Sequence, residues 1–269
     1  MVAMSVEDLR ENGRQSSKGN QLKWESKGIW YKADYLGYEG LAECVVSELL
    51  KKSDLKSSEY VFYEPEEIQY RSVTYTGCRS RDFSEGWQVI TLERLFKNYY
   101  GTGLNEGIYS IADHKDRFQF LVEQVERTTG IKEFGKYMCK LFTIDAFFLN
   151  EDRHTHNISV LMDGKGRFRL CPIYDNGAAL MSDTRMDYPV GCDVLAEVGY
   201  VKAKTICEDF EEQLEIAEAF CGQQIRFGFS AKDVQSILEK MQIYDEEIRN
   251  RVETILRNQR RKYQYLFAE

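Results

Sequence analysis

The first half of the chain alternates between apolar and polar residues in short runs, which is the pattern of β-strands. Residues 21–25 and 28–33 form two such runs around a lysine-glycine turn, and residues 59–63 and 70–75 are rich in aromatic and β-branched side chains. One segment differs, because apolar residues recur at helical spacing within residues 39–51. The pattern therefore predicts a strand-rich first half with a single helix.

The second half of the chain is mostly helical by the same criterion. Helices are predicted near residues 112–128, 131–149, 206–222, 231–242 and 244–266. A hairpin interrupts them at residues 158–174, where apolar alternation surrounds an Asp-Gly-Lys-Gly turn. We therefore expect an α+β fold with a β-rich N-lobe, residues 1–80, and a larger helical C-lobe, residues 81–269.

Composition and charge narrow the functional classes. With 269 residues, 43% of them hydrophobic, the chain can bury a core without disulfides or metals. The net charge of −8 gives no electrostatic reason for the whole molecule to bind nucleic acid. Several arginines gather in the last predicted helix, 244–266, but glutamates are interleaved with them, so a solvated helix face is expected and no nucleic-acid partner.

Cysteine usage and hydropathy bear on the compartment. The seven cysteines are an odd number, lie far apart and show no metal-ligand spacing, so most are expected to be reduced core thiols. The N-terminus has no apolar signal region, and no apolar stretch is long enough for a membrane span. These features predict a cytoplasmic protein without a membrane span.

The residues that indicate chemistry lie between Leu149 and Gly177. Asp152 and Asn157 are five positions apart in a polar loop, the separation between the base aspartate and the metal-binding asparagine in protein-kinase catalytic loops. Asp175 follows the second strand of the predicted hairpin, which should bring it near Asn157. Because phosphoryl transfer needs a carboxylate at the incoming hydroxyl and oxygen ligands for Mg²⁺, this set favours a phosphotransferase over ordinary turn-forming acids and amides.

Three neighbours of these residues have less specific patterns. His154 is expected to pack in the loop and bond its backbone, since magnesium prefers oxygen donors, and His156 has no assigned role. Asp145 falls on the apolar side of the preceding helix. It is expected either to bond the loop backbone and so support Asp152, or to be a plain surface residue.

The segment resembles the HipA-type serine/threonine protein kinases. The matching residues are Asp152-Arg153-His154-Thr155-His156-Asn157 and Ile173-Tyr174-Asp175, and phosphatidylinositol kinases have a similar loop. The resemblance implies a bilobal protein-kinase-like fold, ATP and Mg²⁺ as cofactors, Asp152 as the catalytic base with His154 in its loop, and Asn157 and Asp175 as metal ligands. The chain has Asp-Asn-Gly at residues 175–177, where eukaryotic kinases have Asp-Phe-Gly, so control by a moving phenylalanine is not expected.

The same resemblance extends to the first half of the chain. It implies that Ser16, Ser17, Lys18 and Gly19 cover the nucleotide phosphates, although this stretch also fits an ordinary flexible turn. It also implies that Lys32 contacts the phosphates. The carboxylate partner of Lys32 is Glu39 or Glu43, which lie one turn apart on the next helix, with Glu43 favoured because it lies deeper in the helix.

Position along the chain gives two further expectations. The link between the lobes is expected near Thr76–Ser80, so that backbone around Cys78 meets adenine. Residues after Gly177 occupy the place of an activation loop, where Ser182, Thr184 or Tyr188 could accept phosphate.

Three functions are compatible with these patterns. The first is an ATP-dependent kinase that acts on protein serine or threonine hydroxyls, including its own. The second is a kinase for a lipid or another small molecule. The third is a catalytically silent nucleotide-binding module, which the intact set of Lys32, Asp152, Asn157 and Asp175 disfavours.

Overall fold

The computed structural model describes residues 1–10 and 21–267, which form two compact units. Unit 1 comprises Met1–Phe83, Tyr174–Val201 and Arg226–Glu269, and unit 2 comprises Ser84–Ile173 and Lys202–Ile225. The predicted lobes, 1–80 and 81–269, follow the order of the chain and stay a prediction. The compact units differ from them because two later segments of the chain pack with the N-terminal sheet.

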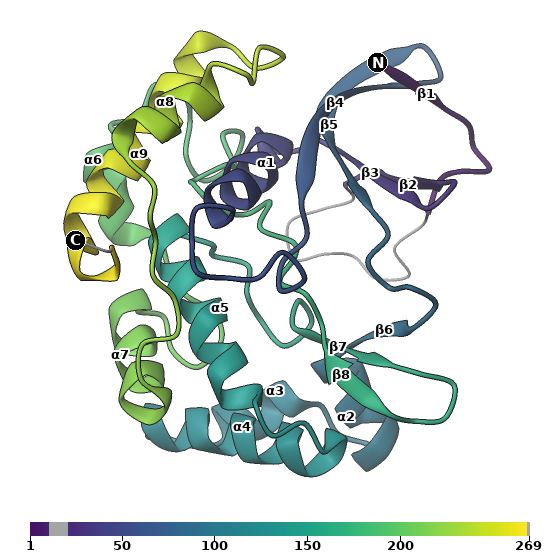
Figure 1. Ribbon diagram of the computed structural model, residues 1–269, viewed down its shortest axis with the longest axis vertical. Coiled ribbons are helices and arrows are strands. Elements are labelled where there is room, and N and C mark those ends of the chain that lie inside the picture. Colours follow the sequence, from purple (N-terminus) through teal and green to yellow (C-terminus); the bar gives the residue numbers. More distant parts are fainter. Residues whose placement is uncertain (11–20, 268–269) are drawn as a thin grey trace. The chain divides into compact units, whose positions relative to one another are not determined.

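Unit 1 is built on a five-stranded sheet (Figure 1). Its strands are β1 (Val2–Met4), β2 (Lys23–Ser26), β3 (Ile29–Ala33), β4 (Tyr63–Tyr70) and β5 (Val73–Arg81), in the order β1-β4-β5-β3-β2. The β2–β3 hairpin forms where the sequence predicts it, because Lys27 and Gly28 both adopt the positive φ of its tight turn. Trp24, fully buried, packs on Tyr70 and Tyr75 in the core of this sheet.

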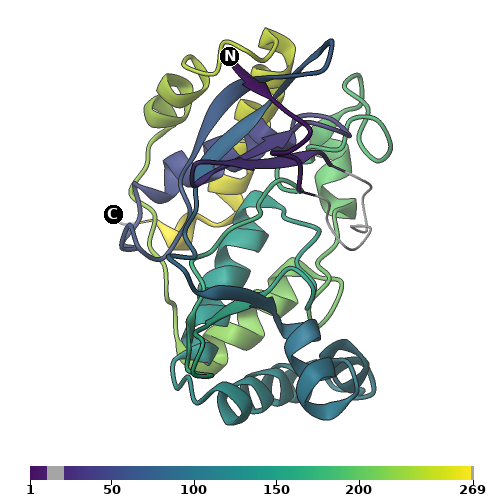
Figure 2. The same ribbon diagram turned by 90° about the vertical axis from the view of Figure 1, so that its right-hand side faces the viewer.

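Helix α1 (Glu39–Leu50) packs on strands β4 and β5 and on helix α8, and Figure 2 shows it against one face of the sheet. Ten of its twelve residues are buried, so it is enclosed on nearly every side. The approach to β5 is close: a Cβ added at Gly40 would lie 2.6 Å from the carbonyl carbon of Gly77. Glycine at position 40 therefore lets α1 approach the sheet closely enough to carry its side chains to β3.

The remaining helices of unit 1 come from the end of the chain and from the segment after β8. They are α6 (Val194–Glu197), the 3-10 turn η1 (Val198–Tyr200), α8 (Ala231–Leu238), α9 (Glu246–Lys262) and the 3-10 turn η2 (Gln264–Leu266). Helix α9 packs on α6 and α8, and α8 in turn packs on α1. Ser230 begins α8 with a reciprocal capping box to Asp233, which explains why the helix starts there.

Unit 2 combines a three-stranded antiparallel sheet with a helical layer. Its elements are β6 (Gln88–Thr91), α2 (Leu92–Tyr100), α3 (Leu104–Tyr109), α4 (His114–Thr129), α5 (Phe134–Phe148), β7 (Ser159–Met162), β8 (Phe168–Leu170) and α7 (Phe210–Cys221). The sheet order is β6-β7-β8, and the predicted hairpin supplies its last two strands. Helix α5, almost wholly buried, packs between α4 and α7 and delivers the chain to the loop that precedes β7.

Two expectations, one from the strand pattern and one from position along the chain, are wrong. The strands expected at residues 59–63 and 70–75 are instead β4 (Tyr63–Tyr70) and β5 (Val73–Arg81), joined at Arg71, which has a φ of 56°. The expected link at Thr76–Ser80 lies within β5, where residues 77–80 pair with both β3 and β4. The turn at Arg71 contains neither glycine nor proline. The glutamates of β4 obscure its alternation of apolar and polar residues, so the strand boundaries could not be read from the sequence.

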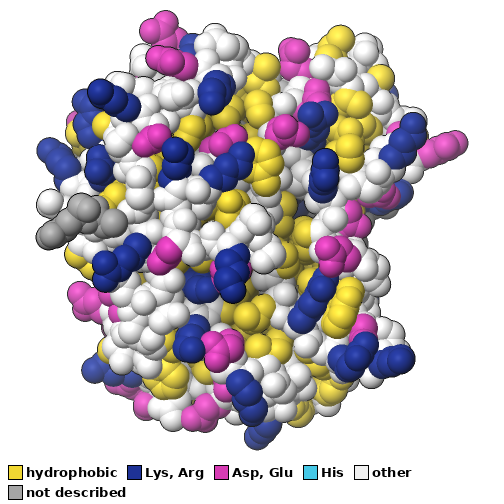
Figure 3. All heavy atoms as spheres, in the orientation of Figure 1, with side chains coloured by type: hydrophobic (Ala, Val, Ile, Leu, Met, Phe, Trp, Pro, Cys, Tyr) yellow, Lys and Arg dark blue, Asp and Glu magenta, His cyan; other side chains and the backbone are white. Residues whose placement is uncertain are grey.

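Among the described residues, no helix combines the length and the apolar character that crossing a membrane requires. On the face of the molecule in Figure 3, basic and acidic side chains are interspersed. That face therefore carries no extended surface of one charge, as expected for a chain with 36 basic and 44 acidic residues.

A buried carboxyl group at the start of α1 makes the stability of the protein depend on pH. Asp34 accepts a hydrogen bond of 2.6 Å from the Gly40 N–H. Burial nevertheless raises its pKa from the ordinary 3.8 to about 7. Between these two pH values Asp34 is protonated in the folded protein and ionised in the unfolded chain. Because of this carboxyl, the free energy of unfolding therefore falls progressively as the pH rises from about 4 to about 7.

Asp34→Asn removes this titration and keeps an oxygen that can accept from Gly40. We expect the variant to melt at a higher temperature than the wild type at pH 8, by roughly 5 °C, and by a clearly smaller margin at pH 5. Thermal unfolding followed by circular dichroism measures both values. An equal difference at the two pH values would show that Asp34 does not titrate in this range.

Candidate active site

Lys32 is the centre of a buried ionic cluster in unit 1. It lies on β3, and its ammonium group donates to Glu43 Oε1 at 2.6 Å and to Asp175 Oδ1 at 2.7 Å. The side chain of Glu43 is only 1% exposed and that of Lys32 11% exposed, so both charges are removed from water. A lysine on the central part of the sheet, a glutamate on α1 and an aspartate from the segment after β8 therefore meet within hydrogen-bonding distance.

The pKa of Lys32 follows from this geometry. Burial alone would lower it, but the carboxylates of Asp175 and Glu43 together outweigh burial, so the pKa of Lys32 lies well above its usual value. The ammonium also lies 5.1 Å from the ring centroid of Tyr63, where the face of the aromatic ring adds a favourable interaction. Lys32 is thus a permanent cation with a fixed position.

Glu43 also fixes the backbone next to Asp175. Its Oε2 accepts a hydrogen bond of 2.8 Å from the N–H of Asn176. Asp175 itself has a φ of 62°, in the left-handed region that non-glycine residues adopt at a cost in energy. The hydrogen bond from Asn176 to Glu43 therefore stabilises the unfavourable backbone conformation of the neighbouring Asp175.

The two glutamates that the sequence offered as partners of Lys32 have separate tasks. Glu39, in the first turn of α1, accepts hydrogen bonds from the backbone N–H groups of Tyr35, Leu36 and Gly37. It closes the turn before the helix, whereas Glu43 lies one turn further on and faces β3. The structure pairs Lys32 with Glu43, the partner favoured by its depth in the helix.

Unit 2 holds the second group of predicted residues in the loop between α5 and β7. Helix α5 ends at Leu149, whose φ of 57° turns the chain out of the helix. The amide of Asn157 then donates to the backbone oxygen of Asp152 at 2.8 Å and to its carboxylate at 3.0 Å. These bonds bring the side chains of Asp152 and Asn157 together. Both use the Nδ2 group of Asn157, so its side-chain oxygen, Oδ1, takes part in neither bond.

His154 contacts the same carboxylate. Its Nε2 lies 3.4 Å from Asp152 Oδ1, and its backbone N–H and carbonyl bond Asp152 and Asn157 respectively. The imidazole also packs edge-on against His156, with ring centroids 5.4 Å apart. The main chain of His154 therefore takes part in the hydrogen bonds of the loop, and its ring lies between Asp152 and His156; its role at the site stays a prediction.

A buried ion pair anchors this loop to α5. The carboxylate of Asp145 is fully buried and accepts from Arg153 Nε at 3.1 and 3.2 Å and from the Asn150 amide at 2.9 Å. Asp145 thus contacts side chains of the loop; of the two expectations, the surface position is wrong. Burial raises the pKa of Asp145, with the Arg153 guanidinium opposing that rise.

Asp145→Ala would leave the guanidinium of Arg153, 2% exposed, without this carboxylate. We expect a loss of about 3–5 kcal/mol in the free energy of unfolding, because a buried charge is costly when one partner of its pair is removed. Urea unfolding of the variant gives this value. Asp116→Ala, an exposed aspartate on α4 in the same unit, is the matched control and should change stability by less than about 0.5 kcal/mol.

Two supports of the loop carry no signal in the sequence. Glu93, 5% exposed on α2, accepts from the Thr155 hydroxyl at 3.0 Å and from the Asn105 N–H at 2.9 Å. The hydroxyl of Thr205 donates to the backbone oxygen of Arg153. These partners are 62 and 52 positions apart in the chain, so only the tertiary fold brings them together.

In unit 1, a buried arginine holds the segment that follows Asp175. Arg251 on α9 is 6% exposed and donates to the backbone oxygens of Tyr188, Pro189 and Val190 and to the Tyr38 hydroxyl. Tyr38 donates in turn to the Leu180 backbone oxygen at 2.6 Å. One guanidinium therefore connects this segment to the residue before α1.

The predicted phosphate acceptors lie in the same segment. Ser182 and Tyr188 are buried, and the Ser182 hydroxyl donates to the Gly177 backbone oxygen. Thr184 is half-buried. Phosphorylation of any of them stays a prediction, and in this conformation the first two are not presented to solvent.

The structure does not bring several of the predicted residues together in one site. Ser16, Ser17, Lys18 and Gly19 lie outside the described residues. Cys78 is fully buried within β5, opposite Lys32 on the neighbouring strand, and burial raises its pKa well above the usual value. Asn157 and Asp175 belong to different units, so their expected proximity stays a prediction.

Comparison with known proteins shows the fold. The crystal structure of a Helicobacter pylori proinflammatory kinase, CtkA, matches with a TM-score of 0.61 and 14% sequence identity, over 98% of this chain and 95% of that chain. No protein-family model matches the chain, and neither does any curated protein. The chain therefore has the α+β, kinase-like bilobal fold that the sequence predicts.

Proposed function

We propose that the protein is an ATP- and Mg²⁺-dependent phosphotransferase, most simply a HipA-like serine/threonine protein kinase. The observation that carries the proposal is the placement of Lys32 between Glu43 and Asp175, at 2.6 and 2.7 Å, in a chain with a kinase-like fold. Protein kinases need a strand lysine paired with a helix glutamate, and an aspartate beside it for the metal ion. The same three residue types occur here on the corresponding kinds of element.

The donor set of the chain fits a magnesium ion. Asp175 offers carboxylate oxygens and Asn157 an amide oxygen, which are the ligands that Mg²⁺ prefers. Once bound there, the ion would neutralise negative charge on the phosphates of ATP. Lys32 would contact the same phosphates, because its ammonium is a fixed cation, and Glu43 would keep that ammonium in place.

Asp152 is the residue proposed to handle the proton. Its carboxylate is oriented by the Asn157 amide at 3.0 Å and by His154 at 3.4 Å, within a loop that the Asp145–Arg153 pair anchors. An acceptor hydroxyl placed against Asp152 would donate its proton to the carboxylate as its oxygen attacks the γ-phosphate, and ADP would leave. The hydroxyl of a protein serine or threonine is the proposed acceptor, including one on the same chain.

The test is transfer of phosphate from Mg-ATP by the purified full chain. ADP formation and the intact mass of the protein are recorded together, with and without a generic serine/threonine substrate protein. A mass gain of whole phosphoryl groups on either protein supports protein-kinase activity. ADP formation with phosphate on an added small alcohol or lipid would indicate the small-molecule alternative, and absence of both ADP formation and phosphate transfer would indicate the silent nucleotide-binding module.

A further inference from the structure

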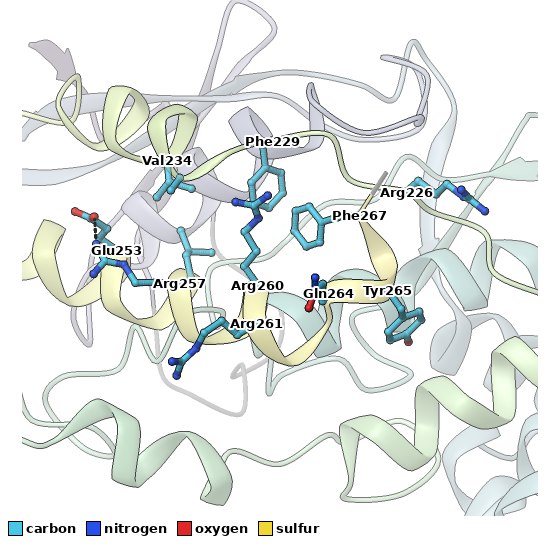
Figure 4. Close-up of a pocket in the computed structure, with 12 residues that line it drawn as sticks. Arg226, Phe229, Val234, Glu253, Arg257, Arg260, Arg261, Gln264, Tyr265 and Phe267 are labelled. Carbon is cyan, nitrogen blue, oxygen red and sulfur yellow. Dashed lines mark hydrogen bonds and ion pairs between the residues drawn. The ribbon is translucent and has the colours of Figure 1, made fainter. Parts of the chain in front are cut away.

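A groove in unit 1 is lined by none of the residues assigned to phosphoryl transfer. Residues of α9, the start of α8, the connection before α8 and the segment after α9 line it, and its volume is about 1210 Å³ (Figure 4). We call it the C-terminal groove. Three of the arginines that the sequence places on a solvated helix face, Arg257, Arg260 and Arg261, belong to its lining.

The floor of the C-terminal groove is apolar. Phe229, Val234 and Leu256 are at most 5% exposed and come from different elements of the unit. The rings of Phe229 and Phe267 pack edge to face with their centroids 5.0 Å apart. The half-buried ring of Phe267 and the ring of Tyr265, which is 54% exposed, complete the floor and give it an apolar surface on which a ligand side chain can be removed from water.

The margin of the groove is basic. Arg257 is neutralised by Glu253 at 2.8 Å, but no carboxylate in residues 1–10 or 21–267 forms an ion pair with Arg226, Arg260 or Arg261. Arg260 lies in the middle of the lining, with its guanidinium 4.9 Å from the ring centroid of Phe267, and Arg226 and Arg261 extend from the margins (Figure 4). Positive charge is concentrated here although the chain as a whole has a net charge of −8.

We propose that the C-terminal groove binds an acidic peptide segment that carries an aromatic or aliphatic anchor residue, and so acts as a docking site for a partner protein. Carboxylates of the segment would pair with the arginines, and the anchor would rest on the floor. The volume exceeds the ~300–1,000 Å³ of typical small-molecule pockets, which favours an extended segment.

The packing of the aromatic rings distinguishes a peptide from a nucleic acid. Binding of single strands relies on exposed ring faces on which bases stack. Phe229 is 2% exposed, and both it and Phe267 already pack against neighbouring side chains. Among the described residues that line the groove, only Tyr265 has an aromatic side chain that is more than half exposed, so the groove lacks the row of exposed rings on which successive bases stack.

Fluorescence anisotropy with the full chain, without ATP, tests the docking site independently of the proposed kinase activity. The probe is a short fluorescein-labelled peptide in which glutamates flank a Leu-Phe pair. We expect saturable binding at moderate salt that weakens as salt screens the ionic contacts. We also expect the R226E/R261E variant and the Tyr265→Ala variant each to weaken binding at least about tenfold, a change of about 1.4 kcal/mol.

The matched control is K232E/K240E, which reverses the same number of charges at exposed positions of unit 1 that do not line the groove. It should bind the probe within about twofold of the wild type, and circular dichroism should show that all variants are folded. Equal binding by R226E/R261E and the control would overturn the proposal. Equal binding of a peptide with Gly-Ser in place of Leu-Phe, or preferential binding of a labelled single-stranded RNA, would also overturn it.

Discussion

Replacing Asp152 with alanine is expected to abolish the phosphoryl mass gained by the protein in Mg-ATP, with the rate of transfer reduced about 100- to 10,000-fold. The reason is geometric. Asp152 is the carboxylate that Asn157 and His154 orient together, and in the proposed mechanism it accepts the proton of the acceptor hydroxyl. Intact mass spectrometry over a time course measures both the extent and the rate.

Two controls separate chemistry from stability in this experiment. Asp152→Asn keeps the shape of the side chain and should be nearly as inactive, because the amide cannot take a proton. Asp116→Ala, an exposed substitution in the same unit, should retain wild-type transfer. If Asp152→Asn transferred phosphate at the wild-type rate, the assignment of Asp152 as the base would be wrong even if the protein proved to be a kinase.

Lys32→Met is expected to lower both stability and activity. It leaves the carboxylates of Glu43, 1% exposed, and Asp175 without the ammonium that lies between them. Removing one partner of a buried ion pair costs about 3–5 kcal/mol in the free energy of unfolding. Phosphate transfer should fall at least about 100-fold, because the cation proposed to contact the nucleotide is lost.

A double variant distinguishes these two effects. Lys32→Met combined with Glu43→Leu removes the buried glutamate along with its partner, and we expect it to regain part of the lost stability, since apolar replacement of a buried pair is often neutral while the Asn176 N–H loses its acceptor. Activity should stay lost. Urea unfolding and the mass assay on the same preparations measure the two quantities, and recovery of activity together with stability would show that Lys32 acts only as a structural residue.

Local patterns in the sequence predicted the elements whose signals are local. Helix α5 was predicted at 131–149 and forms at Phe134–Phe148, because its apolar residues repeat over four turns. Strand β1 was missed, since it has three residues and its parallel pairing with β4 depends on residues more than sixty positions away. The same dependence on distant partners explains the misplaced boundaries of β4 and β5.

In the candidate site, too, the sequence predicts what depends on local spacing and does not predict what depends on tertiary packing. The Asp152–Asn157 pair was predictable because a spacing of five residues lies within one loop. The choice of Glu43 over Glu39 was not decided by spacing, since both lie on one helix face; it depends on the turn before α1, which uses Glu39 to bond three backbone N–H groups. The support of the loop by Glu93 and Thr205 follows only from tertiary packing.

The division of the chain between its two units has a consequence for synthesis on the ribosome. Unit 1 needs Met1–Phe83 together with Tyr174–Val201 and Arg226–Glu269, whereas unit 2 is complete once Ile225 has been made. The sheet of unit 1 is therefore translated first, but α1 is not covered until α8 has been made. Although domains generally fold from the N-terminus as they emerge, here the unit encoded second can finish folding first.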